Sequence, residues 1–409
     1  MLKLTIYVMT LLVVLRSLTL DSIDLLLKEE FGVIIGSYYL HPVDFCLAVL
    51  ILLISITNMK LIFRKEVVLL LCFLGCSYFF DLIIANKYED VVYGNITIAY
   101  LKIVIPLITA LIIVRYMFLN GISKVIIFIL GATYLFVAAQ YSILSLFPID
   151  TWIHETINFG IMTIYRCIST SGPPTAGGYV FFFLFLTCVH LIQNKQCALQ
   201  SRNGLERLIG QKWPMLVAAV LTLTRGLISL AVFAYISDTL KSGRIDRQKF
   251  IVMYVFVGII ILLFLTIISA RIDGGYAIDG DEARVERLTE SFNDVPLSTI
   301  IIGNGFGTLY KREVHWYILD SYDFALRAPH NMNVLLLLEI GLIRLIGLYY
   351  IFAKIFRRYI TRNNTLHAIN LVTTLLILFN TETILTFSEY NYAWFIYLAS
   401  GYYLSDKQE

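Results

Sequence analysis

The chain has 409 residues, of which 58% are hydrophobic and only 15% charged, and its formal net charge is +3. A soluble domain carries roughly 25% charged residues, so this composition excludes an ordinary soluble protein. The absence of a basic patch argues against nucleic acid as a partner, and continuous apolar runs argue against a transmembrane β-barrel, whose strands alternate apolar and polar residues.

Apolar runs of membrane-spanning length recur along the chain and predict an all-α polytopic membrane protein. They lie near residues 4–20, 40–57, 66–85, 97–118, 122–145, 176–194, 249–269, 333–353, 367–386 and 388–405. The first run lacks a small-residue cleavage site and is expected to be a retained span. The six cysteines form neither a CxxC pair nor a metal-ligand spacing, so no disulfide framework or metal site is predicted.

The segment 206–240 is ambiguous, because it fits either one span with Arg225 near its middle or two short spans that meet at Arg225. Lys and Arg favour cytoplasmic loops, and four loops are basic. These are 58–65, 195–212, 241–248 and 354–366. Only two spans place all four loops inside, which favours about twelve spans with both termini cytoplasmic. The two-span interpretation also keeps Arg225 away from the bilayer centre, where inserting an arginine costs roughly 2.5–3.5 kcal/mol of free energy.

The spans and loops divide the chain into four parts. These are N-terminal transmembrane helices (1–145), central transmembrane helices with the Arg225 turn (146–269), a large extracytoplasmic loop (270–331) and C-terminal transmembrane helices (332–409). The loop is the main polar segment, where an integral membrane protein would keep its chemistry. Within it, residues 284–295 fit an amphipathic helix that presents Arg284 and Arg287 together.

The same loop continues into the sequence GNGFG, with Gly303, Gly305 and Gly307. Alternating glycines allow close backbone approach, so a flexible turn and a ligand contact both stay open. The loop ends at His330 and Asn331. A histidine titrates near neutral pH and is a candidate base, although a lone interfacial histidine is more often structural.

Several arginines lie on predicted outer loops or turns, against the charge bias of such loops. They are Arg166, Arg225, Arg284 and Arg287. The planar guanidinium donates two parallel hydrogen bonds to phosphate, which favours a lipid-anchored phosphate substrate such as a polyprenyl-diphosphate sugar. Lipid head groups, or nearby acids such as Asp281, would account for these arginines equally well.

Three motifs together resemble the bacterial O-antigen polymerase and O-antigen ligase superfamily. The first is GNGFG followed by HNMNVLLLLEIGL, with His330, Asn331, Leu335, Glu339 and Gly341 at the family's spacing. The second is LTLTRG around Arg225, similar to a Ser-Arg-Gly turn with Thr224 in place of Ser. The third is RCISTSGPPTAGG, which resembles the family's Arg, Gly and Pro elements at Arg166, Gly172 and Pro174.

The resemblance covers roughly residues 160–350 and has two departures. Arg344 stands where the family has a small residue, and Leu288 stands where it has an aromatic one. The second departure leaves Arg287 as a competitor of Arg284 for the role of the family's arginine.

This resemblance implies a glycosyltransferase class C-like fold with an outer active site that needs no metal or cofactor. The implied reaction transfers a glycan, with inversion, from undecaprenyl diphosphate to the sugar hydroxyl of another lipid-linked repeat unit. Arg225 and Arg284 would bind the diphosphate, and His330 would orient or deprotonate the acceptor hydroxyl. Further substrate contacts would come from Arg166, Arg287, Asn331, Gly303, Gly305 and Gly307.

The expected partners are the undecaprenyl-diphosphate-linked oligosaccharide, the lipid bilayer and a chain-length regulator. The expected location is a bacterial inner membrane, with the active site facing the periplasm. A ligase that transfers the glycan to lipid A-core is the first alternative. A polysaccharide flippase would need internal repeats, and none is evident. A metal-dependent transferase would use Asp21 and Asp24, or Asp279 and Asp281.

Overall fold

In the computed structural model, the described residues are 2–18, 33–35, 38–58, 65–85, 91–120, 123–150, 153–158, 163–167, 174–193, 209, 211–241, 292, 295–307, 331–356 and 388–406. The helices are α1 (Leu2–Leu18), α3 (Pro42–Thr57), α4 (Lys65–Ala85), α5 (Val91–Asn120), α6 (Lys124–Leu146), α7 (Pro174–Gln193), α10 (Trp213–Leu221), α11 (Arg225–Lys241), α14 (Leu297–Ile302), α16 (Met332–Phe356) and α18 (Ser388–Asp406). The strands are β1 (Val33–Ile35), β2 (Tyr38–Leu40), β3 (Ile153–Asn158) and β4 (Thr163–Cys167).

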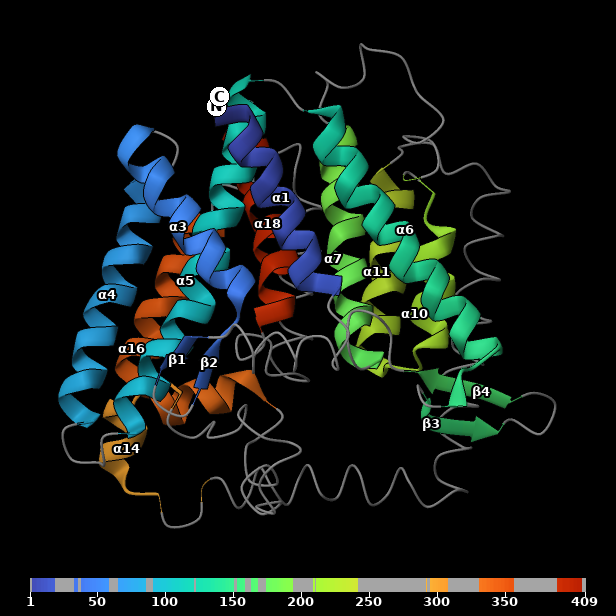
Figure 1. Cartoon of the computed structure of the whole chain (residues 1–409). Coiled ribbons are helices and arrows are strands. Elements are labelled where there is room, and N and C mark those ends of the chain that lie inside the picture. Colours follow the sequence, from blue (N-terminus) through green and yellow to red (C-terminus); the bar gives the residue numbers. More distant parts are fainter. Residues whose placement is uncertain are drawn as a thin grey trace.

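The long helices stand side by side as a bundle (Figure 1). The start of α1 and the end of α18 lie near each other at the upper end in this view, and α14 and both strand pairs lie toward the lower end. We call the lower end the hairpin end. The described parts of the segments predicted to lie on the outer face, namely both strand pairs and α14, lie at this end.

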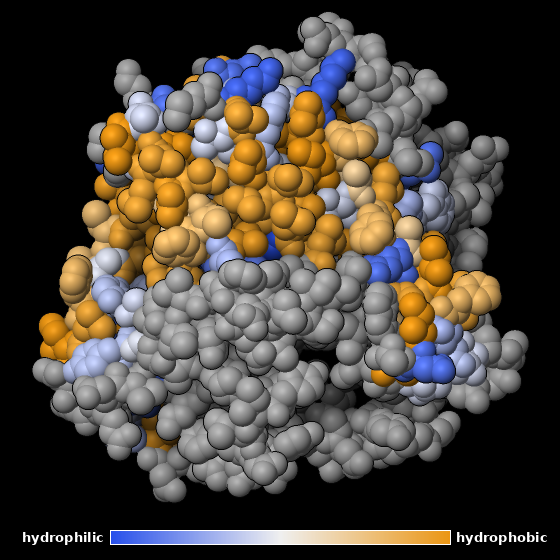
Figure 2. Space-filling view, in the orientation of Figure 1, coloured by the Kyte–Doolittle hydropathy of each residue, from blue (hydrophilic) through white to orange (hydrophobic). Residues whose placement is uncertain are grey.

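The described helices expose many apolar side chains on the outside of the bundle. Figure 2 shows a broad belt of hydrophobic side chains across this face, with hydrophilic side chains gathered at its upper edge. Exposed leucines and isoleucines recur along α1, α3 and α16, among them Leu4, Leu11, Ile56, Ile343 and Ile346. Among the described helices, α4, most of α5, α6 and α16 are long and apolar enough to cross a membrane. A water-soluble bundle would bury such faces, so the fold is that of a membrane protein.

The centre of the bundle is formed by α5, α7 and α18. In α7 the aromatic run Tyr179, Phe181, Phe182 and Phe183 is almost fully buried. These side chains are buried because α7 packs against α6 and α18. The buried end of α18 is tied to α5 by Asn391, whose Nδ2 donates to the Lys102 carbonyl (2.9 Å).

The helices predicted from apolar runs are present wherever the structure describes the chain, but the predicted span 333–353 is broken at Gly341 and is not one straight helix. The ambiguous segment 206–240 contains two helices, α10 and α11, rather than one span. The predicted spans 249–269 and 367–386, and the predicted amphipathic helix 284–295, fall largely or wholly outside the described residues.

The described residues are mostly helical, which is compatible with the predicted all-α membrane protein, and they also contain two short antiparallel strand pairs that were not predicted. β1 pairs with β2 from Val33 opposite Leu40 to Ile35 opposite Tyr38. β3 pairs with β4, with an irregularity between Ile153 and Glu155, and this register places Arg166 opposite Glu155.

Candidate functional site

The turn between α10 and α11 is a tight reversal built by two threonines. Leu223, at its middle, has a positive φ of 53° and a buried side chain. The Thr222 hydroxyl donates to the Ala219 carbonyl (2.8 Å) and accepts from the Thr224 N–H (3.4 Å). These local bonds satisfy backbone groups that a break in a membrane helix would otherwise leave unpaired.

Arg166 is held against this turn. It lies in β4, and its Nε donates to the Thr222 carbonyl (3.0 Å). The next residue, Cys167, is buried and its thiol donates to the Leu144 carbonyl of α6 (3.2 Å). Two segments that are far apart in the sequence, the strand with Arg166 and the helix that begins at Arg225, are therefore fixed next to each other.

The N-terminal turns of α7 and α11 meet at the same place. A Cβ added to Gly178 of α7 would lie 2.5 Å from Leu227 Cδ2 of α11 and 3.5 Å from Thr222 Cγ2. The first N–H groups of a helix have no partner within the helix and carry its positive dipole end. Two such ends, with Arg166 beside them and Arg225 opening α11, form a corner suited to an anion. We call this the anion corner.

A second feature of the hairpin end is a sharp bend in α16 at Gly341, whose φ is 76° and ψ is 162°. The Tyr349 hydroxyl donates to the Asn333 side chain across this bend. A straight helix would separate those residues by about 24 Å. The first half of α16 therefore folds back on the second, and in Figure 1 it runs across the view while the second half stands beside α4.

The GNGFG loop closes the bend. The Asn304 N–H donates to the Leu338 carbonyl (3.0 Å) and the Gly305 N–H donates to the Glu339 carbonyl (2.8 Å). These carbonyls lie in the last turn of the first half of α16. In an uninterrupted helix, N–H groups further along the helix would donate to them. A Cβ on Gly303 would lie 2.3 Å from the Glu339 carbonyl oxygen, and one on Gly341 would lie 2.3 Å from the Ile302 carbonyl carbon.

In the structure, these glycines thus allow close packing of the backbone. The N–H groups of Gly303 and Gly305 both donate to protein carbonyls. Gly307 packs against α5, where an added Cβ would lie 2.6 Å from the Ala99 Cβ. Substrate contact by the three glycines stays a prediction.

Arg344 and Asp81 complete the packing around the bend. Arg344 donates from Nε to the Ile340 carbonyl (2.6 Å) and from Nη2 to the Ile302 carbonyl (2.9 Å). Its Nη1 pairs with Asp81 of α4. Asp81 also accepts from the Tyr100 hydroxyl (2.7 Å) and from the Phe306 N–H of the loop (3.1 Å).

Asn331 directly precedes α16 and caps it. Its Oδ1 accepts from the N–H groups of Asn333 (3.0 Å) and Val334 (3.2 Å). An N-cap of this kind fixes where the helix starts. His330, Arg284 and Arg287 lie outside the described residues, and so does the side chain of Arg225, whose backbone begins α11.

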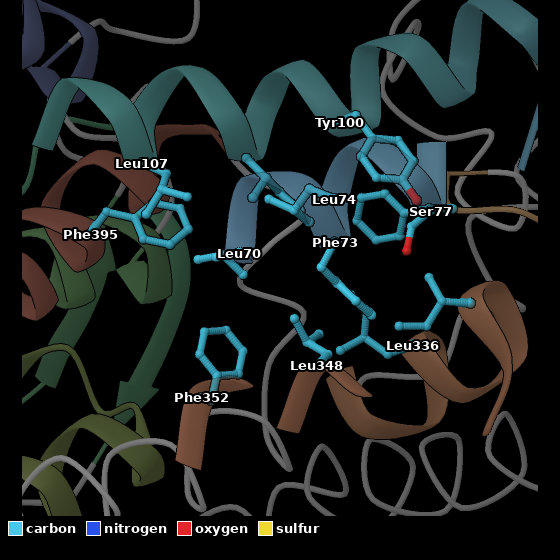
Figure 3. Close-up of a pocket in the computed structure, with 13 residues that line it drawn as sticks. Leu70, Phe73, Leu74, Ser77, Tyr100, Leu107, Leu336, Leu348, Phe352 and Phe395 are labelled. Atoms are coloured by element: carbon cyan, nitrogen blue, oxygen red, sulfur yellow. The ribbon is translucent and has the colours of Figure 1, made fainter. Parts of the chain in front are cut away.

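An apolar cavity of about 40 Å³ lies in the angle of the bent helix (Figure 3). Leu336 and Leu348 line it from the two halves of α16, and Leu70 and Phe73 line it from α4. It is well below the roughly 150 Å³ at which an apolar protein cavity binds benzene. The cavity is therefore a packing gap behind the loop rather than a substrate pocket.

Sequence reasoning missed Asp81 and Thr222, and it assigned Arg344 no partner. The available signal for Asp81 was a single carboxylate within the apolar run YFFDLIIA. Among the described residues, no group of three His, Cys, Asp or Glu side chains could hold a metal ion. Comparisons with protein-family models, with curated proteins and with solved structures give no match to this chain.

Proposed function

We propose that the protein is a membrane-embedded glycan polymerase of the O-antigen type, which elongates a polysaccharide carried on undecaprenyl diphosphate. The observation that carries the proposal is the anion corner. There the starts of α7 and α11 meet, Arg225 opens α11, and Arg166 is held against the turn between α10 and α11. Because this corner lies at the end of an apolar bundle, an anion that reaches it from a lipid anchor would bind at the membrane surface.

In this proposal the corner binds the donor diphosphate through Arg225, with Arg284 as a second arginine. The acceptor sugar hydroxyl attacks the anomeric carbon from the opposite side, and His330 takes its proton. The bond between that carbon and the diphosphate oxygen breaks, and undecaprenyl diphosphate leaves. Preorganised positive charge at the leaving group lowers the barrier, and a diphosphate leaves without protonation.

The bend in α16 supports the second half of this assignment. Asn331 caps the start of the helix one residue after His330, and the bend sets the direction of the first half of the helix. A base must be held at a defined place relative to the anion corner, and a capped helix that folds back on itself provides a rigid mount. The periplasmic location and the repeat-unit substrate belong to the proposal.

A ligase that transfers the finished glycan to lipid A-core would use the same corner and the same base. The two reactions differ only in the acceptor hydroxyl. Lipid-linked single units that accumulate in a deletion strain, while single units are still attached to the core, would identify the polymerase. Loss of all attachment would identify the ligase.

Arg225→Ala in a complemented deletion strain tests the proposal. Chain elongation should fall about 10²–10³-fold, because one preorganised donor to the developing charge is lost. Arg225→Lys should restore only part of it, because lysine lacks the planar fork. The readout is the length distribution of the surface polysaccharide at equal protein level.

Lys212→Ala is the matched control for Arg225→Ala. Lys212 is the N-cap residue at the opposite end of the same pair of short helices, where its ammonium lies 5.0 Å from the centre of the Tyr235 ring. Removing this cation should leave chain length unchanged. Normal long chains in Arg225→Ala, or equal loss in Lys212→Ala, would overturn the assignment.

A further inference from the structure

The contacts that close the bend in α16 lie outside the proposed chemistry. We propose that Asp81 and Arg344 are positioning residues. Together they hold the GNGFG loop in the bend, and we call this set of contacts the lock. The lock sets the position of the first half of α16, which begins at Asn331 beside the proposed base His330. The effect on turnover rests on the proposed function, whereas the lock itself can be measured without it.

The Asp81 carboxylate is the hub of the lock. It is fully buried in α4, with an exposed fraction of 0%. One oxygen, Oδ2, accepts from the Tyr100 hydroxyl of α5 and from the Phe306 N–H of the loop, and the other pairs with Arg344. A buried carboxylate requires partners on both oxygens, so one side chain ties two helices and the loop to α16.

Arg344 supplies hydrogen-bond donors where the bend interrupts the hydrogen bonds of the helix itself. Its Nε donates to the Ile340 carbonyl and its Nη2 to the Ile302 carbonyl, on the two sides of the contact between loop and helix. Nη1 also reaches the Ser77 carbonyl (3.3 Å), and the Phe80 ring covers the guanidinium at 4.8 Å. Only a guanidinium presents this many donors in fixed directions, so lysine cannot replace the set.

The lock acts on the proposed site through the first half of α16. That half is nine residues long and is held at its far end by the loop, through the carbonyls of Leu338 and Glu339. Asn331 caps its near end. If the loop were released, this half-helix would no longer be held in one direction. A shift of about 1 Å at a reacting group can cost about 10²-fold in rate.

The chain contains a matched pair that does not touch the loop. Arg16 of α1 pairs with Asp44 of α3 (3.4 Å), and Asp44 accepts from the Tyr392 hydroxyl (2.5 Å). The chemistry is the same as at Asp81: a buried carboxylate, an arginine and a tyrosine hydroxyl. Asp44→Asn therefore controls for the general cost of weakening a buried ion pair.

Hydrogen exchange measured on the full-length protein in lipid nanodiscs tests the lock directly. Asp81→Asn and Arg344→Lys should raise amide exchange of residues 303–307 at least tenfold, and Asp44→Asn should leave it at the wild-type rate. Unchanged exchange in both lock variants, or an equal rise in Asp44→Asn, would overturn the proposal.

Kinetics on the same samples separate positioning from general stability. With a lipid-linked repeat unit as substrate, Asp81→Asn should lower kcat at least tenfold and leave the donor KM within about twofold, since Arg225 still binds the diphosphate. Asp44→Asn should change neither. A kcat loss shared equally by both variants would make Asp81 merely structural. A wild-type protein that is inert would refute the proposed function, while the exchange rates would still decide whether the lock exists.

Discussion

Gly303 and Gly341 face each other where the loop meets the bent helix. Both have a positive φ with ψ near 165°, a backbone region that only glycine adopts readily. A Cβ added to Gly303 would overlap the backbone of Glu339 and Ile340, and one added to Gly341 would overlap the backbone of Ile301, Ile302 and Gly303. The positive φ and the close packing therefore both require a residue without a side chain, which explains why both positions need glycine.

Gly341→Ala should lower the free energy of unfolding by about 1–3 kcal/mol from backbone strain alone, with overlap against Ile302 adding to it. The loss should appear as a lower midpoint of thermal aggregation in detergent. Gly75→Ala is the control, because nothing lies within 4 Å of its added Cβ in α4. A Gly341→Ala protein as stable as Gly75→Ala would contradict the described bend.

Cys167 gives a pH-dependent test of the packing beside Arg166. Burial raises the pKa of this thiol above its ordinary value of 9.0. The reactive form is the thiolate, so Cys167 should be alkylated slowly at pH 7.5 and faster as the pH rises toward its raised pKa. Maleimide labelling followed by peptide mass spectrometry measures this. Labelling at pH 7.5 as fast as that of a cysteine introduced at the exposed Asp150 would show that β4 does not pack on α6.

At the level of elements, α7 and α11 pack closely at Gly178, where no side chain separates them. Its added Cβ would overlap the end of Leu227, while the Thr222 methyl lies at ordinary contact distance. This approach brings the two helix starts together. The spacing of the anion corner thus depends on a small residue in one helix and a leucine in the other.

Gly178→Ala should therefore push α7 away from α11 and reduce chain elongation about tenfold. Leu227→Ala in the same protein should restore part of it, because removing the leucine end makes room for the new methyl group. A double-mutant cycle on elongation rate measures this coupling. Strictly additive losses would show that the two helices do not meet at these residues.

The helices can be predicted from the sequence, but the bend in α16 cannot. Apolar runs and basic loops place α1, α3, α4, α5 and α6, because lipid imposes length and charge rules on every span. The bend at Gly341 could not be predicted, since EIGLIRL reads as uninterrupted helix and the backbone donors that replace the lost hydrogen bonds come from Asn304 and Gly305. Asp81 and Arg344 likewise acquire their roles only through tertiary contact.

For the whole molecule, the proposed topology puts the two ends of the bundle at opposite faces of the membrane. Asp150 lies after α6 at the hairpin end and Thr57 at the opposite end of α3, and both are exposed. In intact cells, a membrane-impermeant maleimide should label Asp150→Cys and should label Thr57→Cys only after lysis. The wild-type chain, with its native cysteines, gives the background. The reverse pattern would place the anion corner on the cytoplasmic side.

We propose that this bundle elongates a lipid-linked glycan at the anion corner. The most direct measurement uses purified protein in liposomes with an undecaprenyl-diphosphate-linked repeat unit and follows both chain growth and release of undecaprenyl diphosphate. Wild-type protein should form longer chains and release one diphosphate carrier per bond formed, and Arg225→Ala should do neither. A folded wild-type protein that forms no glycosidic bond, or an Arg225→Ala protein that forms them at the wild-type rate, would contradict the claim.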